Sequence, residues 1–173
     1  MGKSFLRRTS NRILHLVARL GPGSQSLRPF LHRLRGVSVG NGVFIGDDVY
    51  IDNEYPECVE IHDNVSISMR AILIAHTRGP GRIVLERDSF IGPNAVLCCY
   101  AGREIRIGAG AVVAAGAVVT RSVPARTLVA PPPSRAVARL QKPLTLQTSI
   151  DEFLAGMVPI PRPDPKRRKQ EMR

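Results

Sequence analysis

An aliphatic residue recurs at every sixth position through most of residues 37–123. The residue two places before each of these positions is also small or aliphatic. A period of six fits neither the 3.6-residue repeat of a helix nor the long alternation of an ordinary strand. It indicates short strands joined by regular corners. The twelve positions are Val39, Ile45, Ile51, Ile61, Ile67, Leu73, Leu85, Ile91, Leu97, Ile107, Val113 and Val119.

The repeat predicts that the chain winds as an all-β solenoid. Within a short strand, side chains two residues apart lie on the same side, so both aliphatic residues of each repeat face inward. Glycine or another small residue often follows, where a corner is expected. Three repeats close one three-sided coil of about 18 residues, and successive coils stack. A β-sandwich is disfavoured because its strands would not keep one phase through twelve positions.

The repeat is interrupted, and one interruption contains a histidine. Ile51 and Ile61 are ten residues apart, and so are Leu97 and Ile107. Between Leu73 and Leu85 one repeat is replaced by residues 76–81, which read HTRGPG. Glycine and proline there predict a loop that leaves the wall of the solenoid, with His76 at its base.

Several segments of the repeat region resemble the hexapeptide-repeat acetyltransferases. The closest group is the sugar O-acetyltransferases related to maltose and galactoside acetyltransferase. The similar segments are residues 55–65, 75–77, 90–96 and 110–124, and the resemblance covers about residues 37–140. It implies a left-handed parallel β-helix that assembles as a homotrimer. It also implies transfer of an acetyl group from acetyl-CoA, as co-substrate, to a hydroxyl of a saccharide or glycan precursor.

His76 matches the catalytic histidine of that family. Neutral imidazole suits the removal of a proton from an attacking hydroxyl, because it titrates near physiological pH. Such a base needs a partner that fixes its tautomer, and stacking of the coils predicts Glu54, or the nearby Asp52, beneath it. His62 lies at a corner where the family often has glycine, so we expect an incidental role for it.

Four positions match residues that contact coenzyme A in the family: Ala115, Thr120, Arg121 and Arg135. Arginine suits the phosphates of this cofactor. The segment 131–134 reads PPPS and departs from the closing Gly-x-Pro-Ala of the family. This departure leaves open a non-catalytic solenoid that serves as a scaffold or an assembly subunit.

The net charge of +11 lies mainly at the ends of the chain. Residues 1–36, a helical arm, contain eight basic and no acidic residues: Lys3, Arg7, Arg8, Arg12, Arg19, Arg28, Arg33 and Arg35. Helices are expected over residues 3–20 and 27–34. The first has an apolar face that would cover the open first coil or lie on an anionic membrane surface; its residues are Leu6, Ile13, Leu16, Val17 and Leu20.

Three further regions follow the arm: the acyltransferase β-helix over residues 37–124, a closing segment with short helices over 125–157, and a disordered basic tail over 158–173. In the closing segment, residues 135–140 are expected to continue as a helix, and Ser149 with Glu152 forms a capping box that opens another. No nucleic acid is expected as a partner, because no aromatic residues accompany the basic tail.

No metal site is expected. The three cysteines lack zinc-site spacing, and no histidine follows His76, so a three-histidine site of the carbonic anhydrase type cannot be assembled. An odd number of cysteines indicates a reducing compartment, and residues 13–20 are too short for a membrane span. The expected location is therefore the cytoplasm, either free or at a membrane surface through the arm. The acceptor is left open between a hydroxyl and an amine.

Overall fold

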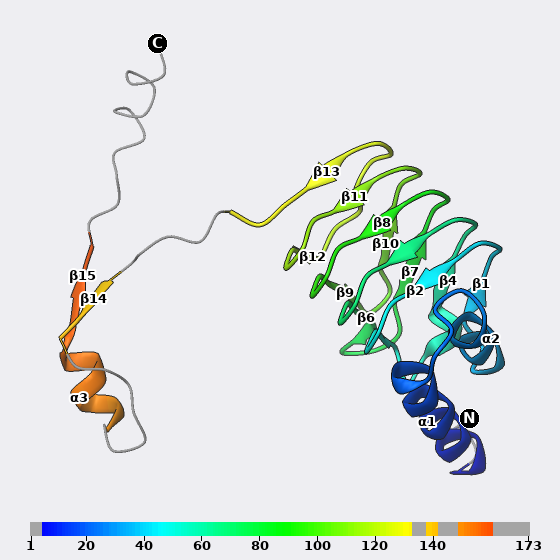
Figure 1. Ribbon diagram of the computed structural model, residues 1–173, viewed down its shortest axis with the longest axis horizontal. Helices are drawn as coiled ribbons and strands as arrows, with labels where there is room; N and C mark the ends of the chain where they lie inside the picture. The colour runs from blue at the N-terminus through cyan, green and yellow to red at the C-terminus, as the bar shows by residue number, and fades with distance from the viewer. Residues whose placement is uncertain (1–4, 133–137, 142–148, 161–173) are drawn as a thin grey trace. The chain divides into compact units, whose positions relative to one another are not determined.

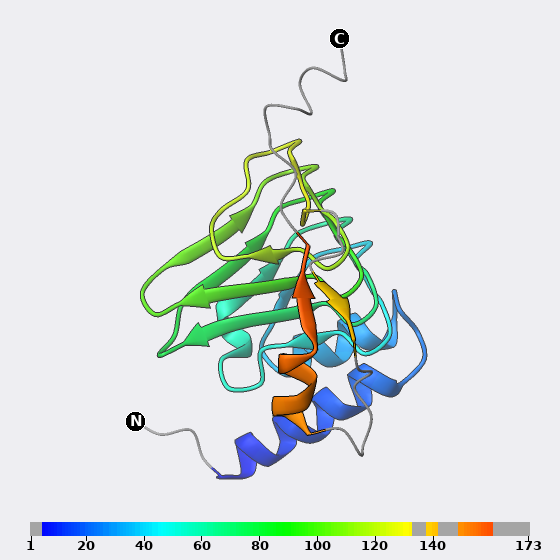
Figure 2. The ribbon, with the colours of Figure 1, turned by 90° about the vertical axis from the view of Figure 1, so that its left-hand side faces the viewer.

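The computed structural model describes residues 5–132, 138–141 and 149–160, which belong to two compact units, Met1–Pro131 and Pro132–Arg173. The first unit is a left-handed parallel β-helix of about four coils, preceded by two helices (Figures 1 and 2). The predicted solenoid is therefore confirmed.

Three parallel sheets form the walls of the solenoid. The first wall contains β1 (Ser38–Val39), β4 (Val59–Ile61), β7 (Arg82–Leu85) and β10 (Glu104–Ile107). The second contains β2 (Phe44–Ile45), β5 (Ser66–Ile67), β8 (Phe90–Ile91), β11 (Val112–Val113) and β13 (Leu128–Val129). The third contains β3 (Tyr50–Ile51), β6 (Ile72–Thr77), β9 (Val96–Tyr100) and β12 (Val118–Val119).

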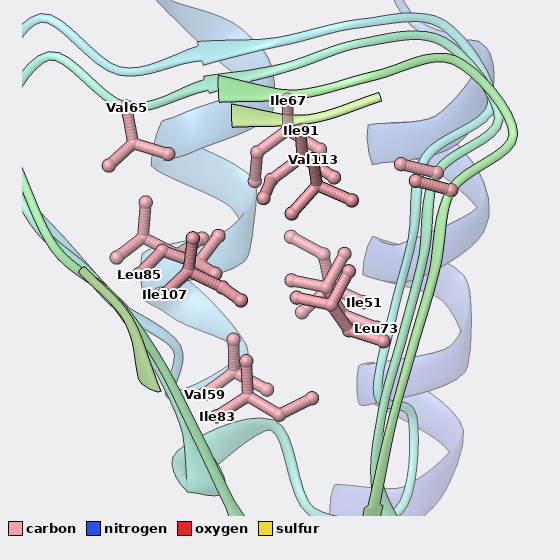
Figure 3. Close-up of a cluster of buried hydrophobic side chains, with 14 of the residues drawn as sticks. Ile51, Val59, Val65, Ile67, Leu73, Ile83, Leu85, Ile91, Ile107 and Val113 are labelled. Carbon is pink, nitrogen blue, oxygen red and sulfur yellow. The ribbon is translucent and has the colours of Figure 1, made fainter. Parts of the chain in front are cut away.

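The residues of the six-residue repeat stack in register inside these walls. Ile45 pairs with Ile67, Ile67 with Ile91, and Ile91 with Val113. The inward side chains form one buried aliphatic core (Figure 3). Val39, in the first coil, is only partly buried against it. Backbone hydrogen bonds between the parallel strands set the spacing between coils, and this register stacks the aliphatic side chains above one another.

The interruptions of the repeat all lie at one corner, where the third wall leads into the first. They form the 3₁₀ turn η1 (Pro56–Cys58), a turn over residues 78–81 and a turn over residues 101–103. The second of these was expected to be a loop leaving the wall, but β6 continues to Thr77 and β7 begins at Arg82. Thr77 O accepts a hydrogen bond from Ala101 N–H at 3.0 Å, so successive turns stack as one elongated corner.

Helices α1 (Phe5–Leu20) and α2 (Leu27–Leu34) cover the open edge of the first coil (Figure 1). An edge strand leaves backbone groups unpaired. One arginine donates to a backbone carbonyl at the end of each of the three strands: Arg33 to Val39, Arg28 to Ile45 and Arg35 to Ile51. The predicted capping role is present, and arginine side chains contribute much of it.

The apolar face expected on α1 does not make this cap. His15 and Ala18 are buried, whereas Ile13, Leu16, Val17 and Leu20 are exposed. The helix therefore packs on the solenoid through the opposite face. The polar cap explains this orientation, because Asn11 and Arg19 bond the first coil from the buried side.

The second unit contains a two-stranded antiparallel sheet of β14 (Ala138–Leu140) and β15 (Met157–Pro159), with α3 (Ile150–Ala155) between them in sequence. The predicted capping box is confirmed: Glu152 N–H donates to Ser149 Oγ at 3.2 Å, and Ser149 N–H to the Glu152 carboxylate at 3.4 Å. The helix expected over residues 135–140 is wrong for residues 138–140, which pair as a strand. Most of the tail expected to be disordered, residues 161–173, lies outside the described residues.

None of the helices in the described part of the chain is long and apolar enough to cross a membrane.

Candidate active site

His76 lies near the end of β6, at the elongated corner of the solenoid. Strand alternation buries Leu73 and Ala75 and turns the His76 side chain outward, where it is 31% exposed. The backbone of β6 is held on both sides by β3 and β9. A rigid wall therefore presents this imidazole to solvent.

Asp52 is the partner of His76. Its carboxylate is completely buried, and Oδ2 lies 2.5 Å from His76 Nδ1. The same oxygen accepts the Ala75 N–H at 2.7 Å. Oδ1 accepts the N–H groups of Glu54 and Tyr55 at 3.0 and 2.8 Å. Backbone N–H groups therefore fix both carboxylate oxygens independently of the imidazole.

These contacts determine the tautomer of His76. A carboxylate that accepts three backbone N–H groups acts as an acceptor, so the proton of the shared hydrogen bond belongs to His76 Nδ1. The lone pair of the neutral ring is then on Nε2. The Tyr55 ring lies 5.6 Å from the imidazole, measured between centroids, and borders it. An imidazole held in this way can accept a proton at Nε2 while the carboxylate fixes the orientation of the ring.

Of the two carboxylates expected beneath His76, Asp52 makes the contact with Nδ1 and Glu54 does not. The Glu54 carboxylate lies 3.6 Å from Arg12 Nη2 on α1. The reason is local: Ile51 pairs with Leu73, so the next residue, Asp52, lies beneath the end of β6. The chain then turns toward η1 and carries Glu54 away from that register.

Sequence reasoning did not find Arg35, which supports the same corner from the arm. Its guanidinium is buried and donates to the backbone carbonyls of Ile51 and Asp52 at 3.0 and 2.7 Å. It also donates to Asn11 Oδ1 and contacts His32 Nδ1. Burial lowers the pKa of Arg35 to about 10, so the group remains a cation at neutral pH. In the sequence, the only indication of this role was that Arg35 is a basic residue just before the first repeat.

His62 lies at a different corner, after β4. Its Nε2 contacts Glu60 Oε1 at 2.7 Å, and Glu60 also binds Arg82. These charges form part of an exposed ladder on the first wall. His62 thus makes a surface hydrogen bond with Glu60, which is compatible with an incidental role.

The positions matched to coenzyme A contacts are only partly brought together. Ala115 is exposed at the corner before β12, while Thr120 and Arg121 are exposed at the corner after it. The outer face of the third wall, with Val118 exposed, runs between them. Thr120 and Arg121 lie at the same edge of this wall as His76. Arg135 lies outside the described residues.

Within the described ranges, no three His, Cys, Asp or Glu side chains are close enough together to hold a metal ion.

Comparisons with known proteins agree with the solenoid. No model of a known protein family matches the sequence. Over 96 residues, which are 54% of this chain and 37% of the relative, it is 34% identical to 2,3,4,5-tetrahydropyridine-2,6-dicarboxylate N-acetyltransferase of Staphylococcus aureus strain bovine RF122 / ET3-1. The relative of S. aureus strain JH9 with the same name is 33% identical over the same length. The chain thus spans little more than a third of the length of these curated relatives.

Among solved structures, a hexapeptide-repeat-containing acetyltransferase of Vibrio cholerae, complexed with acetyl coenzyme A, has a TM-score of 0.51 and 22% identity. The match covers 71% of this chain and 81% of that one. Soybean serine acetyltransferase is 30% identical, with a TM-score of 0.39, over 76% of this chain and 56% of that chain. The solenoid of this protein is therefore similar in fold to a hexapeptide-repeat acetyltransferase, and similar in sequence to an N-acetyltransferase.

Proposed function

We propose that the protein is an acetyltransferase that uses acetyl-CoA, with His76 as the general base. The observation that carries this proposal is the contact between the buried Asp52 carboxylate and His76 Nδ1, at 2.5 Å. It leaves the lone pair on Nε2, which is the form of imidazole that can accept a proton. Similarity to acetyltransferases supports the same chemistry.

The reaction needs little beyond this base. The hydroxyl oxygen or amine nitrogen of the acceptor attacks the thioester carbonyl carbon, and Nε2 of His76 accepts the proton that this atom loses. A bond forms between the attacking oxygen or nitrogen and the carbonyl carbon, and the carbon–sulfur bond of the thioester breaks. Coenzyme A leaves as a thiolate, accepts the proton from the imidazolium and departs as a thiol. No metal has a place in these steps.

Acetyl-CoA would lie along the third wall, between the corner of Ala115 and the corner of Thr120 and Arg121. Both corners are exposed at the ends of β12. We propose these three residues as contacts of the cofactor. Arg135 completes the set only through the family resemblance. A homotrimer, in which the groove would be shared with a second subunit, is likewise a proposal that rests on that resemblance.

For the acceptor we propose a hydroxyl of a saccharide or glycan precursor. A primary amine is the second candidate, because the relative that is 34% identical bears the name of an N-acetyltransferase. Release of free coenzyme A, measured with a thiol reagent against a panel of saccharides, amino sugars and amino acids, distinguishes the two. Turnover with amines alone would contradict the saccharide assignment. A cytoplasmic location also remains a prediction.

Binding of the donor is tested first, by thermal unfolding with and without acetyl-CoA. A ligand that binds only the folded state raises the melting temperature. We expect a rise for the wild type and a similar rise for His76→Ala, which lacks the base but keeps the groove. Turnover with the best acceptor should fall by about 10²–10⁴-fold in His76→Ala. No stabilisation by acetyl-CoA would favour the scaffold alternative.

A further inference from the structure

Both arm helices carry exposed apolar side chains that do not pack on the solenoid. On α1 they recur at helical spacing, and on α2 they do the same. Their exposed fractions run from 37% to 72%. We call these seven residues the arm surface: Ile13, Leu16, Val17 and Leu20 on α1, and Leu27, Phe30 and Leu34 on α2.

On α1 the arm surface lies opposite the side that packs on the solenoid. Two exposed residues each lie two positions before a buried one: Ile13 before His15, and Leu16 before Ala18. Two residues correspond to about 200° around an α-helix. Packing against the first coil therefore cannot cover this face. On α2, Phe30 is exposed in the same way, whereas Leu31 and His32 are buried.

The charge of the arm identifies the chemistry of its partner. Residues 1–36 contain eight basic and no acidic residues. Arg28 and Arg35 are buried in the cap, and Arg19 pairs with Asp48, so these three do not face a partner. Among the described cations of the arm, Arg7 and Arg33 are exposed, and the Arg12 side chain is 69% exposed although it lies 3.6 Å from the Glu54 carboxylate. Two copies of the arm placed face to face would bring these positive charges together, which disfavours a second copy. Anionic phospholipid headgroups would neutralise them while the apolar side chains enter the interface.

We propose that the arm surface docks on an anionic phospholipid bilayer, with α1 lying in the plane of the interface. An amphipathic helix with basic residues beside an apolar face is the form that binds in this way. The same helix touches the corner of the candidate site: Asn11 Nδ2 lies 3.3 Å from Asn53 Oδ1, and Arg12 lies 3.6 Å from Glu54. Docking would therefore place the lipid surface on the side of α1 that faces away from this corner.

Vesicle co-sedimentation of the full chain tests this proposal without any assay of acyl transfer. We expect the wild type to bind vesicles of phosphatidylcholine and phosphatidylglycerol, and to bind phosphatidylcholine alone much more weakly. Binding should weaken as salt is raised, because surface charges are then screened. No binding to the anionic vesicles, or equal binding to both kinds, would overturn the proposal.

A double variant locates the surface. Leu16→Gln with Leu20→Gln removes exposed apolar side chains but keeps good helix formers, and should reduce vesicle binding by about tenfold. The matched control is Val118→Gln with Leu128→Gln, at two exposed apolar positions of the solenoid, and should bind like the wild type. Equal loss in both variants would overturn the assignment. So would a fall in particle mass by light scattering in the arm variant without a loss of vesicle binding, because the surface would then join two copies.

Discussion

Asp52 Oδ2 lies 2.5 Å from His76 Nδ1, although the two residues are 24 positions apart in the chain. One coil of the solenoid brings them together. The register Ile51–Leu73 places Asp52 beneath the end of β6, and the Ala75 N–H fixes the oxygen that the imidazole meets. The backbones of two neighbouring coils therefore position the two side chains that make this contact.

Asp52→Asn tests this contact. The amide has the size of the carboxylate, but only one of its two ends can accept hydrogen bonds. When its oxygen accepts the N–H groups of Glu54 and Tyr55, its NH2 group faces His76 Nδ1 and favours the tautomer that is protonated at Nε2. We expect kcat to fall by about 10²–10⁴-fold, because the wrong tautomer leaves Nε2 protonated. Glu54→Gln should retain most of the activity. The measurement is steady-state release of coenzyme A, and a larger loss in Glu54→Gln than in Asp52→Asn would assign the role to Glu54.

Arg35→Met should destabilise the protein by about 2–4 kcal/mol. It leaves the carbonyls of Ile51 and Asp52 buried without their donor, and each buried group that loses its partner carries a desolvation penalty. Arg33→Met is the matched control, because Arg33 binds its carbonyls at an exposed edge, and should cost less than about 1 kcal/mol. Urea unfolding of both variants gives the difference. Equal losses would show that the buried arginine is no more important than the exposed one.

Ile67→Ala should lower the free energy of unfolding by about 2–5 kcal/mol, since Ile67 is fully buried between Ile45 and Ile91 and a rigid column cannot close the cavity. Val118→Ala, on the exposed side of β12, should change it by less than about 0.5 kcal/mol. Denaturant unfolding measures both. A mild effect at Ile67 would mean that neighbouring coils move together to fill the space.

The six-residue repeat predicted the columns because register and burial follow directly from spacing. It predicted that the repeated aliphatic residues of successive coils stack, and the structure pairs Ile45 with Ile67 and Ile67 with Ile91. It could not decide between Glu54 and Asp52, because the insertion after Ile51 changes the direction of the chain. Which carboxylate meets His76 depends on a local turn that spacing does not encode.

The arm shows a second limit. Helical spacing identified the apolar face of α1, and the usual expectation would bury it. Instead the open edge of the first coil offers backbone carbonyls, and arginine side chains are better partners for these than leucine. The need to pair an exposed sheet edge decided which face turned inward, and no pattern within the helix reports that need.

The stability of the protein should decrease as the pH is lowered from about 6.5. Burial lowers the pKa of His15 and of His32 to about 3, and the positive charge of Arg35 acts in the same direction. In the unfolded chain both histidines titrate near 6.5, so between these values the unfolded state binds more protons and is favoured by acid. The effect cannot exceed about 1.4 kcal/mol per pH unit for each histidine.

Urea unfolding at several pH values above and below 6 measures this slope. Glu60 adds a slope of the same sign only at lower pH, near the ordinary range of a carboxyl, because its hydrogen bonds with His62 and Arg82 lower its pKa. The comparison is therefore made above about pH 5.5. In His15→Phe the aromatic contact with Tyr50, at 4.8 Å between ring centroids, can be kept while one titrating group is removed. The slope should then be about half that of the wild type. An unchanged slope would exclude His15 as a source.

Arg121→Gln tests the proposed position of the coenzyme. Arg121 is exposed at the end of β12, and a guanidinium there can bind a phosphate of acetyl-CoA through charge-assisted hydrogen bonds. Loss of one such interaction should raise KM for acetyl-CoA by about tenfold and leave kcat nearly unchanged, because it is made equally in the ground state and the transition state. Arg87→Gln, at an exposed corner between the first and second walls, is the matched control and should leave both constants unaltered. If the two variants behave alike, the nucleotide of the coenzyme does not lie at the end of β12. A fall in kcat alone would instead indicate that Arg121 acts on the reacting group.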